Sequence, residues 1–328
     1  MSAQVLRPAA GANAPRWDGS SPGHYEVWYL TLSDPATRRG LWFRYTLEIP
    51  KGAEAPRVAE LWAFAFRPGG PAVGGKETMP LSWPPSGVMQ IGAARLDEGR
   101  ATGSVAGITW DLAWDPPPTA MWHIPGRLGE SRLPSTRVVC PALGVTFRGT
   151  VTIDGETLVL DAARGCQTHL WGRQHAARWA WGHCSAWDEG EGEAVLEAVW
   201  AVPPLAPGRA APAGPTLLYA QVDGKAFACN ALPWLARARS RVTGHRWEMS
   251  GRTRDARVRA FLEARPAEMA QVTYEDPDGA HAWCANSEVA IGVLEVERNG
   301  VLRRFTTDGL AHVEFGARHP DPDVPILC

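Results

Sequence analysis

The feature that most constrains the fold of this chain is the alternation of side chains along many short segments. In HYEVWYLTL (24–32), one set of alternating positions holds Glu26, Trp28, Leu30 and Leu32, and the other holds Tyr25, Val27, Tyr29 and Thr31. A period of two residues is typical of β-strands. The one plausible helix is short, around LPWLARARSRV (232–242). The sequence therefore predicts an all-β, antiparallel fold.

Two strong turn signals place some of these segments in hairpins. GVTFRGTVTIDGETLVLD (144–161) turns at Asp154-Gly155, and VLEVERNGVLRRFTT (293–307) turns at Asn299-Gly300. Asp-Gly and Asn-Gly are favoured in two-residue hairpin loops because they tolerate positive φ. We expect a tight hairpin at each place.

The two hairpins also suggest an internal repeat. Cys140 and Cys284 precede their respective turns by nearly the same number of residues. We infer two similar domains, 1–164 and 165–328, with chance similarity between hairpins as the alternative. About eight strands in each half suit a closed barrel, which can enclose one small ligand.

Composition narrows the function classes. The 328 residues carry a formal net charge of −2 and no basic stripe, which argues against a nucleic-acid partner. The six cysteines form no CxxC pair, so we expect neither a disulfide scaffold nor a metal site. We also see no secretory signal and no apolar run near the roughly 18 residues of a transmembrane segment. These features predict a cytoplasmic protein.

Tryptophan is unusually frequent, with 16 Trp against 5 Tyr and 8 Phe. The stretch GCQTHLWGRQHAARWAWGHCSAW (165–187) is the richest. Alternation puts Trp179, Trp181, His183, Ser185 and Trp187 on one face of a strand. Such a face can fill a barrel, line a ligand cavity or seal an interface between domains.

The histidines of this stretch differ in their surroundings. His169 and His183 lie among tryptophans, where a polar group can orient a ligand. His175 lies in the polar connection RQHAAR, where we expect it to be solvated. His183 and Cys184 are adjacent on a strand and point to opposite faces, so we expect Cys184 to be a buried, inert thiol.

Three motifs carry a resemblance to a known family. THLWG followed by WAWGHC resembles the D-H-N-W-G…W-x-W-G signature of the hydroxyneurosporene synthase (carotenoid hydratase) group. That group belongs to the double-lipocalin proteins, with AttH-like proteins, tocopherol cyclases and fungal Diels–Alderases. HYEVWYLTL is similar to the group's first strand, E-x-W-Y-F, and CPALGVTFRGTVTIDGE resembles its closing hairpin. The resemblance implies two lipocalin-like barrels in tandem, and a hydrophobic, isoprenoid- or polyketide-like ligand near their junction.

The chain departs from that family at one important position. Thr168 stands where the hydratases carry Asp, while His169 matches their His and Leu170 stands at their Asn. Hydration of an alkene needs an acid that protonates carbon, and Thr168 cannot be that acid. Glu26 matches the first-strand Glu, either as an acid or as a structural acceptor. We therefore keep cyclisation and isomerisation as candidate reactions together with hydration.

Ten residues are candidates for the site. We expect His169, His183 and Glu26 to be catalytic. We expect the ligand to contact Trp28, Gln167, Trp171, Trp179, Trp181, Trp283 and Asn286. The predicted function is a cofactor-free cyclisation, isomerisation or hydration of a hydrophobic small molecule, without metal. The alternatives are a non-catalytic carrier or sensor of such a ligand and a scaffold with a filled barrel.

Overall fold

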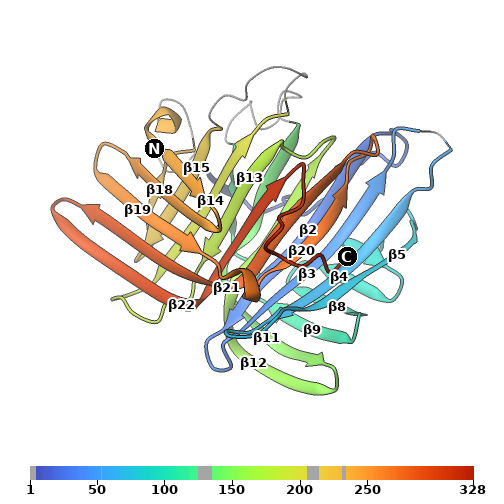
Figure 1. Ribbon diagram of the computed structural model, residues 1–328, viewed down its shortest axis with the longest axis horizontal. Coiled ribbons are helices and arrows are strands. Elements are labelled where there is room, and N and C mark those ends of the chain that lie inside the picture. Colours follow the sequence, from blue (N-terminus) through green and yellow to red (C-terminus); the bar gives the residue numbers. More distant parts are fainter. Residues whose placement is uncertain (1–4, 53, 125–134, 205–213, 231–233) are drawn as a thin grey trace.

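The computed structural model describes residues 5–52, 54–124, 135–204, 214–230 and 234–328, which form two antiparallel β-sheets (Figure 1). The strands of the first sheet are β1 (Leu6–Pro8), β2 (His24–Asp34), β3 (Arg39–Ile49), β4 (Val58–Phe66), β5 (Val73–Pro80), β6 (Met89–Ile91), β7 (Ala94–Asp97), β8 (Arg100–Val105), β9 (Ile108–Trp114), β10 (Thr119–Trp122), β11 (Thr136–Ile153) and β12 (Glu156–Gly172). The predicted all-β class is confirmed.

The second sheet follows in the chain and occupies the other side of the molecule in Figure 1. Its strands are β13 (Arg178–Cys184), β14 (Ala194–Val202), β15 (Thr216–Val222), β16 (Lys225–Ala228), β17 (Arg239–Thr243), β18 (Arg246–Arg252), β19 (Ala256–Glu263), β20 (Ala270–Glu275), β21 (His281–Arg298) and β22 (Val301–Ala317). The expected helix around 232–242 is instead a short 3-10 turn, Trp234–Arg237, followed by β17, and residues 231–233 lie outside the described part of the chain.

The two sheets have equivalent strand orders over nine strands, and β6 extends the first sheet by one more. The first runs β5-β4-β3-β2-β12-β11-β9-β8-β7-β6, and the second runs β16-β15-β14-β13-β22-β21-β19-β18-β17. Each sheet curls, since β5 lies near β8 and β15 lies near β18. The tandem architecture therefore agrees with the predicted pair of barrel-like units.

The passage between the sheets lies later than the predicted boundary at 164/165. β12 continues to Gly172 and pairs with β2 as far as that residue, whereas β13 begins at Arg178 in the second sheet. The predicted position 164/165 therefore falls inside β12, whose last residues carry the THLWG motif and still belong to the first sheet. The division into separate domains stays a prediction.

Both predicted hairpin turns are present and have the expected backbone. Asp154 and Gly155 have φ of 47° and 89°, and Asn299 and Gly300 have φ of 52° and 78°. Positive φ at both central residues is the type I′ geometry, which matches the twist of the flanking strands. The turns join β11 to β12 and β21 to β22, the two longest hairpins.

Apolar side chains form a core within each sheet and a third layer between the sheets. On β2, Trp28 and Leu30 enter the first core, whereas Tyr25 and Val27 enter the layer between the sheets. On β13, Ala180 and Cys184 enter the second core, and Trp181 faces the first sheet. The predicted alternation of faces is confirmed on both strands.

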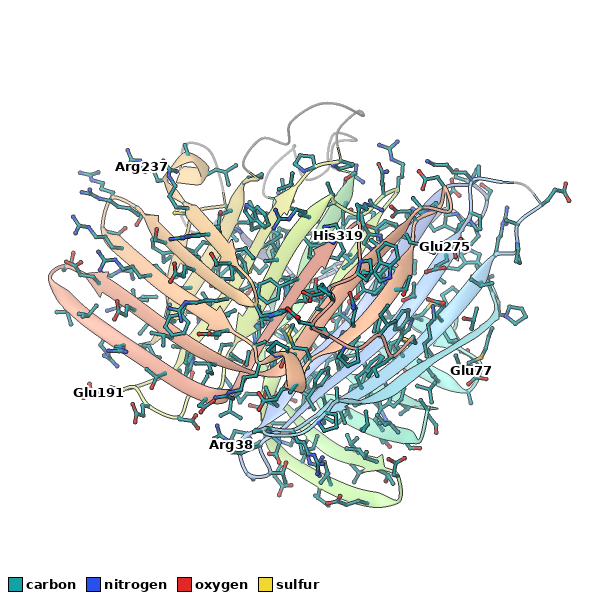
Figure 2. All side chains as sticks on the ribbon, viewed as in Figure 1. Arg38, Glu77, Glu191, Arg237, Glu275 and His319 are labelled. Atoms are coloured by element: carbon teal, nitrogen blue, oxygen red, sulfur yellow. The ribbon has the colours of Figure 1, made fainter. Side chains whose placement is uncertain are left out.

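Polar contacts also hold the two sheets together. Arg38, labelled in Figure 2 where the sheets approach each other, forms an ion pair of 2.7 Å with Asp188. Inside the interface, His312 Nδ1 lies 2.9 Å from Thr31 Oγ1, and its Nε2 lies 2.7 Å from Ser33 Oγ. Within the described residues, no helix has the length and apolar character needed to cross a membrane.

Candidate functional site

A cavity of about 200 Å³ lies between the two sheets. Its walls come mainly from β2 and β3 of the first sheet and from β13, β14 and β15 of the second. Residues that line it include Tyr25, Val27, Tyr29, Arg44, Thr136, Leu170, His175, Trp179, Trp181, Val199, Leu217, Tyr274 and Glu314. The cavity therefore depends on both halves of the chain.

Aromatic rings form much of the wall. Tyr29 and Trp181 meet edge to face across the sheets, with ring centroids 5.6 Å apart. His175 stacks on Tyr25 at 4.5 Å and on Tyr274 at 5.1 Å. Offset and edge-to-face contacts of this kind fix ring positions. An apolar, unsaturated ligand would meet preorganised aromatic surfaces.

Glu314 of β22 places a carboxyl group in this aromatic cavity. Trp179 Nε1 donates a hydrogen bond of 2.9 Å to Glu314 Oε1. Burial raises the pKa of Glu314 above its ordinary value, against the lowering effects of the Trp179 hydrogen bond and of nearby Arg44. A carboxyl with a raised pKa keeps its proton to higher pH, as a general acid requires.

His175 supplies a complementary group. Asp276 Oδ1 accepts hydrogen bonds from the His175 backbone N–H at 2.7 Å and from Nδ1 at 2.8 Å, while Arg318 Nη1 lies 2.6 Å from Asp276 Oδ2. Burial lowers the pKa of His175, although its contacts with Asp276 raise it. A neutral ring that donates from Nδ1 carries its lone pair on Nε2 and can accept a proton there. The expectation that His175 is solvated is wrong, because its ring is stacked in the cavity wall.

Two tyrosines add hydroxyl groups beside these residues. Tyr25 Oη lies 2.6 Å from Thr136 Oγ1. Burial raises the pKa of Tyr25 and of Tyr29 well above the ordinary tyrosine value. Both phenols therefore stay protonated at neutral pH and can donate hydrogen bonds.

Of the residues predicted to contact a ligand, Trp179 and Trp181 line the cavity. His183 lies behind the wall, fully buried, with Nδ1 2.9 Å from Glu197 Oε2 and Nε2 3.0 Å from Ser185 Oγ. Trp181 Nε1 donates to Glu197 Oε1 at 2.8 Å, and the Trp181 ring stacks on that of His183 with centroids 6.4 Å apart, so His183 contacts a residue of the cavity wall without lining the cavity itself.

The predicted catalytic pair Glu26 and His169 lies on the other face of the first sheet. His169 Nε2 is 2.7 Å from Glu26 Oε1, and His169 Nδ1 is 2.8 Å from the Ala12 carbonyl. Glu26 also accepts hydrogen bonds from the backbone N–H groups of Arg16 and Trp17 and from His24. Neither residue lines the cavity, and together they hold the segment 9–17 against the sheet.

The same N-terminal segment contacts three more of the predicted residues: Gln167, Trp28 and Trp171. Gln167 Nε2 donates to Asn13 Oδ1 at 2.9 Å, and Trp28 Nε1 donates to the Asn13 carbonyl at 3.0 Å. The Arg16 guanidinium lies over the Trp171 ring at 4.9 Å. These three side chains therefore contact other residues of the protein and do not line the cavity.

The remaining two predicted contacts lie elsewhere. Trp283 borders a surface hollow beside Trp179 and Phe315. Asn286 is buried, and its Nδ2 donates to Glu288 Oε1 at 3.1 Å. The structure thus gathers two of the ten predicted residues at the cavity. It adds Glu314 and His175, and behind His175 its partner Asp276, none of which the sequence predicted as site residues.

Two known proteins are similar in sequence to this chain over nearly its whole length. The uncharacterized proteins MT0513 and Rv0493c of Mycobacterium tuberculosis are each 32% identical over 334 residues, covering 97% of this chain and 96% of theirs. No protein-family model matches the sequence.

Two solved structures share the fold. The AttH-like protein of Nitrosomonas europaea superposes with a TM-score of 0.54 at 13% identity, over 95% of this chain and 100% of its own. Kievitone hydratase of Nectria haematococca gives a TM-score of 0.53 at 9% identity, over 95% and 94%. At such identities the likeness concerns the fold. By sequence, the chain belongs to the family of the two Mycobacterium tuberculosis proteins.

Proposed function

We propose that the protein binds a compact hydrophobic molecule between its two sheets and hydrates or isomerises a double bond in it by proton transfer. The observation that carries the proposal is the presence of Glu314 and His175 in one aromatic cavity. The first has a raised pKa and the second a lowered pKa. Groups with opposed shifts in one cleft suit the roles of acid and base.

In the hydration, the O–H bond of Glu314 breaks as a new C–H bond forms at one alkene carbon. Aromatic rings in the cavity wall stabilise positive charge on the other carbon through cation–π attraction. A water oxygen bonds to that carbon while its proton passes to His175 Nε2. Return of the proton from His175 to Glu314 through solvent restores the enzyme.

In the isomerisation, the same two groups act without water. Protonation of one carbon by Glu314 is followed by loss of a proton from a neighbouring carbon to His175. The double bond moves and the composition of the molecule is unchanged. A cyclisation would differ only in that a second double bond attacks the cationic carbon before the proton leaves.

The size of the cavity limits the substrate. Its volume of about 200 Å³ lies below the roughly 300–1,000 Å³ typical of drug-sized ligand pockets. We therefore favour a small isoprenoid- or polyketide-like molecule over a long carotenoid chain. The hydratase name of one solved structure with this fold supports hydration as the first reaction to test.

The test incubates the purified protein with a lipid and metabolite extract from its source in ¹⁸O-labelled water, and in D₂O. Mass spectrometry then follows bound and free compounds over time. A gain of one labelled water indicates hydration, and an isomer that carries carbon-bound deuterium indicates isomerisation. A compound that stays bound and unchanged would favour the carrier alternative and reject catalysis for that ligand.

A matched pair of variants separates chemistry from binding. Glu314→Gln keeps the shape of the side chain and can still accept the Trp179 hydrogen bond, but it cannot supply the proton. Glu248→Gln changes an exposed carboxyl of β18 and serves as the control. Turnover lost only in Glu314→Gln, with the ligand still bound, supports an acid role for Glu314, and equal turnover in both variants rejects that role.

A further inference from the structure

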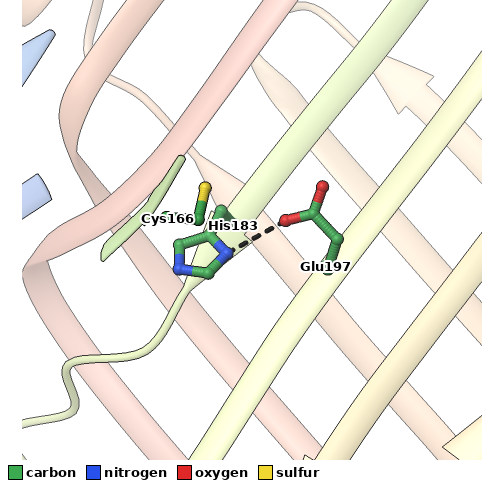
Figure 3. Close-up of side chains that lie close together, drawn as sticks. All are labelled: Cys166, His183 and Glu197. Carbon is green, nitrogen blue, oxygen red and sulfur yellow. Dashed lines mark hydrogen bonds and ion pairs between the residues drawn. The ribbon is translucent and has the colours of Figure 1, made fainter. Parts of the chain in front are cut away.

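A second cluster of reactive side chains lies behind the cavity wall. It consists of Cys166 on β12, His183 on β13 and Glu197 on β14, all fully buried. Figure 3 shows the three side chains converging from separate strands. One thiol sulfur, one imidazole nitrogen and one carboxylate oxygen lie within 4.8 Å of one another.

From this convergence we propose that Cys166, His183 and Glu197 bind a transition-metal ion of the Zn²⁺ class. Zinc takes sulfur at about 2.3 Å and nitrogen or oxygen at about 2.0–2.2 Å, so ligand atoms on a tetrahedral ion lie about 3.5 Å apart. The most distant pair, up to 4.8 Å apart, must approach by about 1.3 Å, whereas His183 Nδ1 and Glu197 Oε2, 2.9 Å apart, must separate by about 0.5 Å. Thiolate and imidazole select a borderline or soft ion over Mg²⁺ or Ca²⁺.

Each of the three ligands has an outer partner that suits this role. His183 Nε2 lies 3.0 Å from Ser185 Oγ, so a ring that donates there presents the Nδ1 lone pair to the ion. Trp181 Nε1 donates to Glu197 Oε1, so the ion would take Oε2 and replace the hydrogen bond that joins Oε2 to His183 Nδ1 in the structure. Thr168 Oγ1 lies 3.7 Å from Cys166 Sγ and can donate to a thiolate.

The cluster lies next to residues of the cavity wall. His123 Nε2 lies 2.9 Å from Glu197 Oε1, and both His123 and Trp181 line the cavity. Three protein ligands leave a fourth coordination position, as at zinc sites that bind water or substrate. Spacing along the chain gave no hint of the set, because its members come from three strands.

The proposal does not depend on the proposed function, so its test uses metal alone. The full-length protein is treated with a chelator under reducing conditions and then titrated with Co²⁺ while its absorption is recorded. We expect one equivalent to bind with a sulfur-to-cobalt charge-transfer band and intense visible bands of tetrahedral Co²⁺. Zn²⁺ should then displace the cobalt and remove the bands.

Variants tie the spectrum to the residues. Cys166→Ser should abolish the charge-transfer band and weaken Co²⁺ binding at least tenfold, and Ser185→Ala should weaken it about tenfold. Cys229→Ser removes another buried thiol, in the core of the second sheet, and should change neither property. Because loss of Glu197 can unfold a buried network, Glu197→Gln is interpreted only if its circular dichroism matches that of the unmodified protein.

The outcomes are distinct. A wild-type spectrum without the charge-transfer band overturns the proposal without any variant, and so does a band that survives Cys166→Ser. In either case His183 and Glu197 are a hydrogen-bonded pair that ties β13 to β14. Failure to find an organic substrate leaves the metal titration unaffected, so the two proposals fail separately.

Discussion

The two faces of the paired strands β2 and β12 both carry aromatic and polar residues, yet their side chains have different roles. One face carries Glu26, Trp28 and His169, whose polar groups are hydrogen-bonded to the segment 9–17 or to each other. The other face carries Tyr25 and Tyr29 and borders a cavity. Both faces carry the same kinds of residue, but one is covered by the segment 9–17 and the other borders the cavity.

The carboxyl groups on the two sides differ in how many hydrogen bonds they accept and in their pKa. Glu26 accepts four hydrogen bonds, and although burial raises its pKa, the bonds from His169 and His24 hold that pKa at about 2. Glu314 accepts a hydrogen bond from Trp179 and borders the cavity, and burial, the largest effect on its pKa, raises that pKa. A fully bonded carboxylate fixes the structure, while a poorly solvated one keeps a proton that it can transfer.

The largest contrast is expected between the two carboxyl groups in activity. Once a substrate is known, Glu314→Gln should lower kcat by about 10²–10⁴-fold, since general acid catalysis contributes that much. Glu26→Gln should leave kcat of the folded fraction within about twofold, because Glu26 lies away from the cavity. Steady-state kinetics on both variants decide, and an active Glu314→Gln would remove the proposed acid.

In stability, the contrast should be reversed. Glu26→Gln should lower the free energy of unfolding by about 3 kcal/mol, since it leaves His169 and two backbone N–H groups without their carboxylate. Glu314→Gln should be neutral or slightly stabilising, because a carboxyl that is costly to ionise is replaced by an amide. Urea denaturation measures both, and equal losses would contradict the division of roles.

The acid stability of the protein should depend on Glu26. Its folded pKa of about 2 lies below the ordinary 4.5, so its stabilisation is complete above pH 4.5 and is lost as the pH falls towards 2. The loss amounts to about 3 kcal/mol. Denaturation midpoints measured between pH 6 and 2 should fall less steeply in Glu26→Gln than in the unmodified protein. Parallel curves would show that other carboxylates control acid unfolding.

The pH dependence of turnover should report the cavity pair. The reaction needs neutral His175, so the rate falls as the pH drops through a pKa below the ordinary 6.5. It needs protonated Glu314, so the rate falls as the pH rises through a pKa above the ordinary 4.5. In His175→Asn the residual rate should lose the acidic limb alone. An acidic limb that persists in this variant would place the base elsewhere.

The smallest expected effect concerns the hydrogen bond from Trp179. That bond lowers the pKa of Glu314, so Trp179→Phe should move the alkaline limb of the rate profile upward by less than about one pH unit. Trp187→Phe is the control, because its Nε1 donates to the Ala194 carbonyl outside the cavity lining. A shift in the opposite direction would contradict the assignment of this limb to Glu314.

Much of the fold could be predicted from local pattern. Alternation identified the faces of β2 and β13, and Asp154-Gly155 and Asn299-Gly300 marked the two long hairpins, because strand geometry and turn backbone are local properties. The passage from one sheet to the other comes later than residue 164, because the length of β12 depends on its pairing with β2 and β11. Local pattern also cannot show which sheet a strand joins.

Less of the candidate site could be predicted from the sequence. Trp179 and Trp181 were found because their strand is conspicuous, whereas Glu314 lies in an ordinary alternating segment of β22 and Asp276 follows β20. His175 looked solvated because its neighbours in sequence are polar, but Tyr25 and Tyr274 enclose it from distant strands. Contacts between residues so far apart in the chain leave no local signal.

The position of the cavity between two separate cores has a consequence for how such a chain can diversify. Each sheet has its own apolar core, and the cavity lies in the seam between them, lined by side chains such as Val27, Leu170, Val199 and Leu217. Exchanges there reshape the opening without altering either core. The seam is therefore where descendants of this architecture can acquire new ligand preferences while both barrels stay folded.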